Sequence, residues 1–289
     1  MNAIAVVNPR TRRRRLLRRR FLRRPVAVAG LVVLLGYVIV AIFAPWIAPH
    51  RSGFTDFGHI LAHPSSRYPL GTDELGHDEL SRIIWGARAS MQVGVLATLL
   101  AMLIAVPIGM IAGYYRGWID TVIARATDVL LSFPFVILGV GLAAILGPSL
   151  LNATLAIGIG AIPAFVRIAR GETFALREED YVPAAIANGA SDRTIIFRHI
   201  LPNMTSTLLV QATLTIPQAI IGEAVLSFLG LGVQPPETSW GVMLQTAQDQ
   251  LGQAPRLAVY PGVALVLAVL AFNVFGDGLR DILDPRTTR

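Results

Sequence analysis

The sequence predicts an all-α integral membrane protein with six transmembrane helices. Of its 289 residues, 54% are hydrophobic and only 15% are charged, and the mean hydropathy is +0.59. Soluble domains average about 25% charged residues. Several apolar runs of about 20 residues match the hydrocarbon layer of a bilayer. Within that layer such runs must be helical, because a helix satisfies its own backbone hydrogen bonds.

Six apolar runs are long enough to cross the bilayer, the fourth only just. They cover residues 26–48, 89–113, 122–147, 150–168, 205–230 and 257–279. Prolines interrupt many of the runs, among them Pro107, Pro134, Pro163 and Pro217, and glycines recur throughout. These residues indicate close helix packing, hinges, or both.

The basic charge is concentrated at the N-terminus. All 25 basic residues are arginines, and ten of them lie between Arg10 and Arg24. The other 15 arginines face 18 acids, so the net charge of +7 arises from this tail. A polybasic stretch beside an apolar run favours an anchor on anionic membrane lipid over a nucleic-acid-binding surface.

The arginines also predict the orientation. With the N-terminus inside, the inner segments hold 20 arginines and the outer segments hold 5. The positive-inside rule therefore places both termini in the cytoplasm. The expected organisation is a cytoplasmic tail at 1–24, a first transmembrane helix at 25–48, a turn-rich outer segment at 49–88, a five-helix core at 89–282 and a cytoplasmic tail at 283–289. The core includes an inner loop at 171–204 and an outer loop at 233–256.

The inner loop has the pattern of two short helices. Asp180 is a candidate N-cap, and Pro183 would lie in the first turn, where a missing N–H does no harm. Ala184-Ala185 favours a helix, and Asn188-Gly189 supplies a stop. Ser191 can cap a second, amphipathic helix that carries Ile195–Phe197 and Ile200 and ends at Pro202. This pattern fits either a passive connection or an element that enters a groove on a partner protein.

The run Ala184-Ala185…Gly189…Ile195…Ile200-Leu201-Pro202 resembles the EAA loop of permease subunits of ABC importers. Two further stretches resemble the dipeptide/oligopeptide/nickel subfamily. They are Tyr68-Pro69-Leu70-Gly71-Thr72-Asp73-Glu74-Leu75-Gly76 and Leu226-Ser227-Phe228-Leu229-Gly230-Leu231-Gly232. The match covers about residues 20–285 in order, and it is closest to the DppC/OppC type of subunit.

This resemblance implies the type I ABC importer permease fold in a bacterial inner membrane. It implies four partners: a second permease subunit of the DppB/OppB type, two cytoplasmic ATPase subunits and an extracytoplasmic solute-binding protein. The chain would form half of the translocation path for dipeptides or oligopeptides. It would not be catalytic and would hold no cofactor, since ATP and Mg would bind to the ATPases.

The resemblance further implies that the inner loop is a coupling helix that docks on an ATPase. The residues expected to take part are Asp180, Tyr181, Pro183, Ala184, Ala185, Asn188, Gly189, Ala190, Ser191, Asp192, Ile195, Phe197 and Pro202. Pro183 replaces the usual acidic residue before the two alanines, so this position offers no carboxylate for a salt bridge.

Two acids lie inside predicted spans. Arg125 precedes Asp128 by three residues, which predicts a local ion pair on one helix face. Glu223 has no predicted local partner, so it would hydrogen-bond across the bundle or line the path. It belongs to a run that the subfamily shares, Glu223-Ala224…Leu226-Ser227, which favours a structural role.

Several chemistries are excluded or disfavoured. The chain has no cysteine, and without lysine it cannot form a phosphate-binding P-loop. His59, His63 and His77 lie among turn residues and favour a solvated loop over a metal site. A secondary transporter or channel that works without ATP is the alternative, but only Glu223 qualifies as an ion-coupling acid. A membrane enzyme ranks third, because no nucleophile–base pair stands out.

Overall fold

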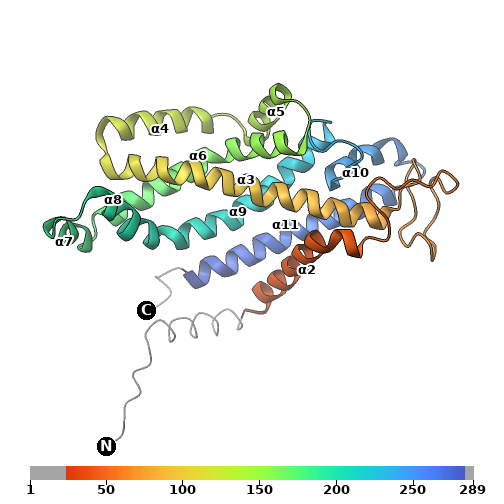
Figure 1. Ribbon diagram of the computed structural model, residues 1–289, viewed down its shortest axis with the longest axis horizontal. Helices are drawn as coiled ribbons and strands as arrows, with labels where there is room; N and C mark the ends of the chain where they lie inside the picture. Colours follow the sequence, from red (N-terminus) through yellow and green to blue (C-terminus); the bar gives the residue numbers. More distant parts are fainter. Residues whose placement is uncertain (1–23, 284–289) are drawn as a thin grey trace, which may run out of the picture.

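A computed structural model of the protein describes residues 24–283, and this part of the chain is all-α (Figure 1). The only β-type pairing within it is an isolated bridge between Thr72 and Asp78. The predicted tails, 1–24 and 283–289, lie outside the described residues apart from Arg24 and the last residue of the final helix.

Five helices are long and apolar enough to cross a membrane. They are α2 (Pro25–Ile47), α3 (Glu79–Tyr115), α6 (Leu150–Arg177), the helix Asp192–Phe228 that includes α9 (Leu201–Phe228), and α11 (Arg256–Leu283). A sixth span is reached when α4 (Gly117–Leu131) and α5 (Phe135–Leu146) are counted together. The predicted all-α membrane fold is confirmed.

The expectation of one helix over 122–147 is wrong. α4 and α5 meet at an angle of 89° across a short break. Pro134 stands immediately before α5 in an extended conformation, with ψ 132°. Because proline lacks an N–H and disfavours a helical conformation in the residue before it, the chain leaves the helix at this point.

Several helices extend beyond the predicted spans, α3 and α6 among them. α3 begins at Glu79, so residues 79–88 of the predicted outer segment are helical. The Asp78 side chain caps this start by accepting a hydrogen bond from the Ser81 N–H at 3.1 Å. α6 continues past residue 168 to Arg177.

α3 and α6 pack closely through glycines. A Cβ added at Gly109 of α3 would lie 2.7 Å from Ala169 Cβ, and one at Gly113 would lie 2.6 Å from the Arg170 carbonyl oxygen. Both distances are too short for a side chain, so the glycines let the two backbones approach each other. This contact favours the packing interpretation for these two glycines.

The connecting segments separate to the two ends of the bundle (Figure 1). One end carries residues 48–78 and α10 (Trp240–Ala247), followed by a 3₁₀ turn, Gln248–Gln250. The other end carries α7 (Tyr181–Ala187) and α8 (Asp192–Thr194). The start of α2 and the end of α11 lie together, joined by an ion pair between Arg24 and Asp281. The loops predicted to share a side of the membrane therefore share an end of the bundle.

Candidate functional site

The most prominent surface feature is the α7–α8 element, which projects from one end of the bundle (Figure 1). The prediction that Asp180 caps α7 is wrong. Asp180 has helical dihedral angles (φ −52°, ψ −28°), and its side chain makes no capping hydrogen bond. The turn between α6 and α7 supplies an acceptor instead. The backbone N–H of Val182, at the start of α7, donates to the Glu179 carbonyl at 2.9 Å.

The predicted stop and the second cap are confirmed. Gly189 has φ +79°, a left-handed conformation that glycine adopts without strain. The Gly189 N–H donates to the Ile186 carbonyl at 2.9 Å, and the Asn188 amide donates to the Ala184 carbonyl at 2.8 Å. Ser191 Oγ accepts a hydrogen bond from the Thr194 N–H at 3.4 Å, at the start of α8.

The prediction that Pro202 ends the second helix is wrong. α8 continues through a π-helical stretch, Ile195–Ile200, directly into α9. In the wide turn before Pro202, the Leu201 N–H donates to the Ile196 carbonyl five residues back. Pro202 is then the second residue of α9, where its missing N–H is tolerated.

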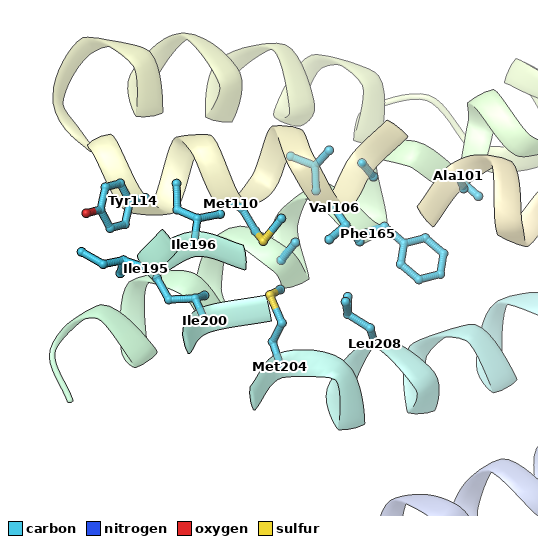
Figure 2. Packing of buried hydrophobic residues seen from close by; sticks show 14 of the residues in the cluster. Ala101, Val106, Met110, Tyr114, Phe165, Ile195, Ile196, Ile200, Met204 and Leu208 are labelled. Atoms are coloured by element: carbon cyan, nitrogen blue, oxygen red, sulfur yellow. The ribbon is translucent and has the colours of Figure 1, made fainter. Parts of the chain in front are cut away.

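A buried apolar cluster holds the element to the bundle (Figure 2). Ile195 and Ile200 are fully buried and belong to the same cluster as Met110 of α3 and Phe165 of α6. Tyr181, Ala185 and Ala190 are half-buried and pack against the same cluster. Ile195 therefore positions the element and has no surface to offer a partner.

The remaining predicted coupling residues are exposed. They are Asp180, Pro183, Ala184, Asn188, Gly189, Ser191, Asp192, Phe197 and Pro202. Two large apolar side chains of this region are exposed: Phe197, which was predicted, at 52%, and Ile186, which was not, at 53%. The sequence reasoning missed Ile186, although a bulky apolar residue in an alanine-rich helix outside the spans was a usable signal.

One polar contact ties the element to α3, and two more join the neighbouring ends of α3 and α6. The Tyr114 hydroxyl, at the end of α3, donates to Asp192 Oδ1 at 2.8 Å. The Arg177 guanidinium lies 5.1 Å from the centre of the Tyr114 ring, and Arg116 forms an ion pair with Glu178. A displacement of α8 would therefore act directly on the end of α3.

Glu223 lies in the interior of the bundle and is fully buried. Its carboxyl accepts hydrogen bonds from Ser90 of α3 at 2.8 Å and from Ser227 at 2.6 Å. The hydrogen bond across the bundle was predicted. The prediction that Glu223 has no local partner is wrong, because Ser227 lies one helical turn away. These hydrogen bonds favour a structural role for Glu223.

Asp128 is exposed, and its predicted pairing with Arg125 is wrong. The carboxyl instead pairs with Arg167 of α6 at 3.2 Å. α4 runs alongside α6, and this brings Arg167 to the carboxyl from a neighbouring helix.

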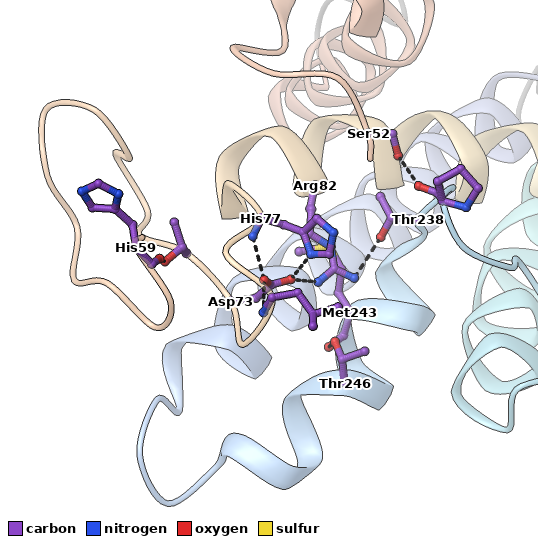
Figure 3. A network of polar contacts seen from close by, with 11 residues as sticks. Ser52, His59, Asp73, His77, Arg82, Thr238, Met243 and Thr246 are labelled. Atoms are coloured by element: carbon purple, nitrogen blue, oxygen red, sulfur yellow. Dashed lines mark hydrogen bonds and ion pairs between the residues drawn. The ribbon is translucent and has the colours of Figure 1, made fainter. Parts of the chain in front are cut away.

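A second polar network lies at the opposite end of the bundle (Figure 3). The Asp73 carboxyl contacts His77 Nδ1 at 2.7 Å and forms an ion pair with Arg82. Arg82 also reaches the Thr238 hydroxyl, at 3.5 Å. Burial acts to raise the pKa of Asp73, but the His77 hydrogen bond and the Arg82 charge outweigh it and hold the pKa below its usual value. The network joins residues 48–78 to the loop before α10.

Comparison with known proteins defines the class. Residues 105–289 match the family described as "Binding-protein-dependent transport system inner membrane component", and residues 13–64 match the "N-terminal TM domain of oligopeptide transport permease C". The chain belongs to this family of ABC importer permeases, which confirms the resemblance to the DppC/OppC type.

Particular relatives extend over almost the whole chain. A glutathione transport system permease protein GsiD from Pectobacterium atrosepticum is 45% identical over 93% of this chain and 89% of its own length. A dipeptide transport system permease protein DppC from Alkalihalophilus pseudofirmus is 44% identical over 90% of this chain and 86% of its own.

A solved structure shares the fold. It is an inward-facing conformation of the MetNI methionine ABC transporter, with a TM-score of 0.57 at 20% sequence identity. The alignment covers 70% of this chain and 96% of the solved one. This similarity confirms the predicted ABC importer permease fold.

Proposed function

We propose that the protein is one permease subunit of an ATP-driven importer of small peptides, and that the α7–α8 element docks on an ATPase subunit. The observation that carries the proposal is the construction of this element. Its inner face is anchored in the bundle, while the side chains of Ile186 and Phe197 are exposed. An apolar pair on a firmly held projection suits insertion into a partner's cleft.

The family supplies the setting for this proposal. A second permease of the DppB/OppB type would complete the translocation path. Two ATPases would bind on the cytoplasmic side, and a solute-binding protein on the outer side. The arginine distribution supports a cytoplasmic location for both termini, the tails 1–24 and 283–289, and the 171–204 loop. Residues 49–88 and 233–256 would face the binding protein.

The substrate class follows from the relatives. The two similar permeases are named for dipeptide and glutathione transport, and glutathione is itself a tripeptide. A short peptide is therefore the substrate that we propose.

The coupling step is a shift between inward-open and outward-open states. ATP on the partner subunits would favour one state through its differential binding. Displacement of α8 would then move α9, with which it is continuous, and α3, to which Asp192 is hydrogen-bonded. This chain contributes binding and motion, while the hydrolysis takes place on its partners.

The test uses the assembled complex in proteoliposomes. Ile186→Asp and Ala184→Glu place charge on the exposed face, and Ala175→Glu, on the exposed surface of α6, is the matched control. We expect both element variants to lose at least about tenfold in peptide uptake and in stimulated ATPase activity, since apolar anchors dominate such interfaces. The control should stay near wild type.

Wild-type uptake and wild-type ATPase stimulation in both element variants would refute the docking assignment. Uptake that survives ATP depletion but collapses with the proton gradient would refute ATP-driven transport and favour a secondary transporter.

A further inference from the structure

A cavity of about 360 Å³ opens at the end of the bundle opposite α7. Its walls come from residues 48–78, the first turns of α3, the start of α6 and the loop before α10. The polar side chains that line it are Ser52, Arg88, Gln92, Glu237 and Thr238. The cavity adjoins the Asp73 network through Thr238 and lies apart from the proposed coupling element.

The cavity holds two opposite charges that do not neutralise each other. Among the described residues, neither Arg88 nor Glu237 takes part in an ion pair within 4.0 Å. The Arg88 guanidinium lies over the Trp85 ring, 5.9 Å from its centre. Since the cation and the anion share one cavity without pairing, both remain available to a ligand that carries both charges.

Hydrogen bonds fix the walls. Trp85 Nε1 donates to the His50 carbonyl at 3.1 Å, and Ser52 donates to the Pro236 carbonyl at 3.1 Å. Thr238 is buried and accepts from Arg82, as Figure 3 shows. The side chains around the two free charges are therefore held in place before any ligand arrives, which reduces the entropy lost on binding.

We propose that this cavity is an entry site for a short zwitterionic peptide, with Arg88 binding the terminal carboxylate and Glu237 the terminal ammonium group. The proposal rests on the peptide substrate proposed above. The volume lies within the range of small-ligand sites, about 300–1,000 Å³. Guanidinium and carboxylate are natural partners, and their hydrogen bonds are charge-assisted. Trp85 and Leu150 supply an apolar wall for peptide side chains.

A peptide ligand is favoured over a loop of the solute-binding protein because of the charges. A dipeptide carries a free carboxylate and a free ammonium group within the span of one cavity. The backbone of an internal protein loop carries neither terminal charge. Only a free peptide can therefore bind both Arg88 and Glu237 through its two terminal charges.

The experiment measures equilibrium binding of radiolabelled dialanine to the complete transporter in nanodiscs, without the solute-binding protein. The variants are Arg88→Gln and Glu237→Gln. Arg51→Gln removes an exposed charge at the same end and is the control. Dialanine amide and N-acetyl-dialanine, each lacking one terminal charge, are the matched probes.

We expect Arg88→Gln to weaken dialanine binding about tenfold while leaving the affinity for the amide unchanged. Glu237→Gln should weaken dialanine binding to a similar degree and leave the affinity for the acetylated peptide unchanged. Arg51→Gln should bind all three probes like the wild type.

Unchanged dialanine binding in both variants would overturn the proposal, as would an equal loss for charged and blocked peptides. Unchanged dialanine binding with lost ATPase stimulation by the binding protein would overturn it in favour of a docking surface. A wild-type complex that couples ATP hydrolysis to the uptake of some other solute, and imports no peptide, would instead refute the proposed substrate.

Discussion

Glu223 joins segments that are distant in the sequence. Its carboxyl receives hydrogen bonds from Ser90 of α3 and from Ser227 near the end of α9. A buried acid in a membrane protein is expensive unless it is hydrogen-bonded, and here two hydroxyls serve that purpose.

Substitution of Glu223 separates a structural role from a role in the path. Glu223→Gln retains an acceptor oxygen and the side-chain shape, so we expect near-normal thermal stability and uptake within about twofold of wild type. Glu223→Ala leaves buried hydroxyls without acceptors, at a cost of about 1–3 kcal/mol for each. Thermal unfolding of the purified protein in detergent measures this loss. A Glu223→Gln protein of normal stability but strongly reduced uptake would point to the path instead.

Asp73 predicts an acid-sensitive contact at the opposite end of the bundle. Its pKa is lowered in the folded state, so the stabilisation is present above the unfolded value of about 3.9 and is lost as the pH falls through the folded value. The stability advantage of the wild type over Asp73→Asn should therefore be constant between about pH 5 and 7 and shrink below about pH 4. Unfolding midpoints measured across this range test the prediction, and an advantage that grows on acidification would contradict it.

At the scale of elements, the prolines show where local sequence is decisive and where packing overrides it. Pro107, Pro163 and Pro217 lie inside unbroken helices, whereas Pro134 separates α4 from α5. A proline removes one hydrogen bond, and a helix held along its length by neighbours tolerates that loss. The sequence marks all four positions alike, so only the tertiary contacts of each helix distinguish them.

The α3–α6 contact gives a matched pair of substitutions. Gly109→Ala places a methyl group 2.7 Å from Ala169 Cβ and 2.7 Å from the Val166 carbonyl oxygen. Such overpacking costs about 1–3 kcal/mol. Gly141→Ala on α5 is the control, because nothing lies within 4 Å of the added carbon. We expect a lower unfolding temperature for the first variant only; equal temperatures would show that α3 and α6 separate easily.

At the scale of the whole molecule, the connecting segments of the described residues lie at the two ends of the bundle. The arginine counts are the basis for proposing which end faces the cytoplasm. The sequence contains no cysteine, so single cysteines can be introduced without background labelling. A membrane-impermeant maleimide should label Ser66→Cys in intact spheroplasts and Glu179→Cys only after permeabilisation. Both positions are exposed. The reverse pattern would invert the proposed topology.

Much of this architecture could be predicted, for reasons that differ between regions. Apolar runs of bilayer length located the spans, and Gly189 and Ser191 located the turn between α7 and α8, because left-handed backbone and helix caps are local properties. The partners of Asp128 and Glu223 depend on contacts between distant helices, and no spacing along one helix reveals Arg167 or Ser90. The exposure of Ile186 and the burial of Ile195 likewise depend on how α7 and the π-helical stretch pack onto the bundle.

The uninterrupted helix from Asp192 to Phe228 has a mechanical consequence. Its 37 residues make a rod of about 55 Å, from the turn that follows Gly189 at one end of the bundle to beyond Glu223 near the other. Since no loop lies along it to absorb movement, a tilt of about 5° about one end sweeps the other end through about 5 Å, by the geometry of a rod of this length. A stroke of that size is comparable to the spacing of extended peptide chains. In the proposed transport cycle, a small rotation at one face of the bilayer would therefore be enough to open or shut a passage at the other.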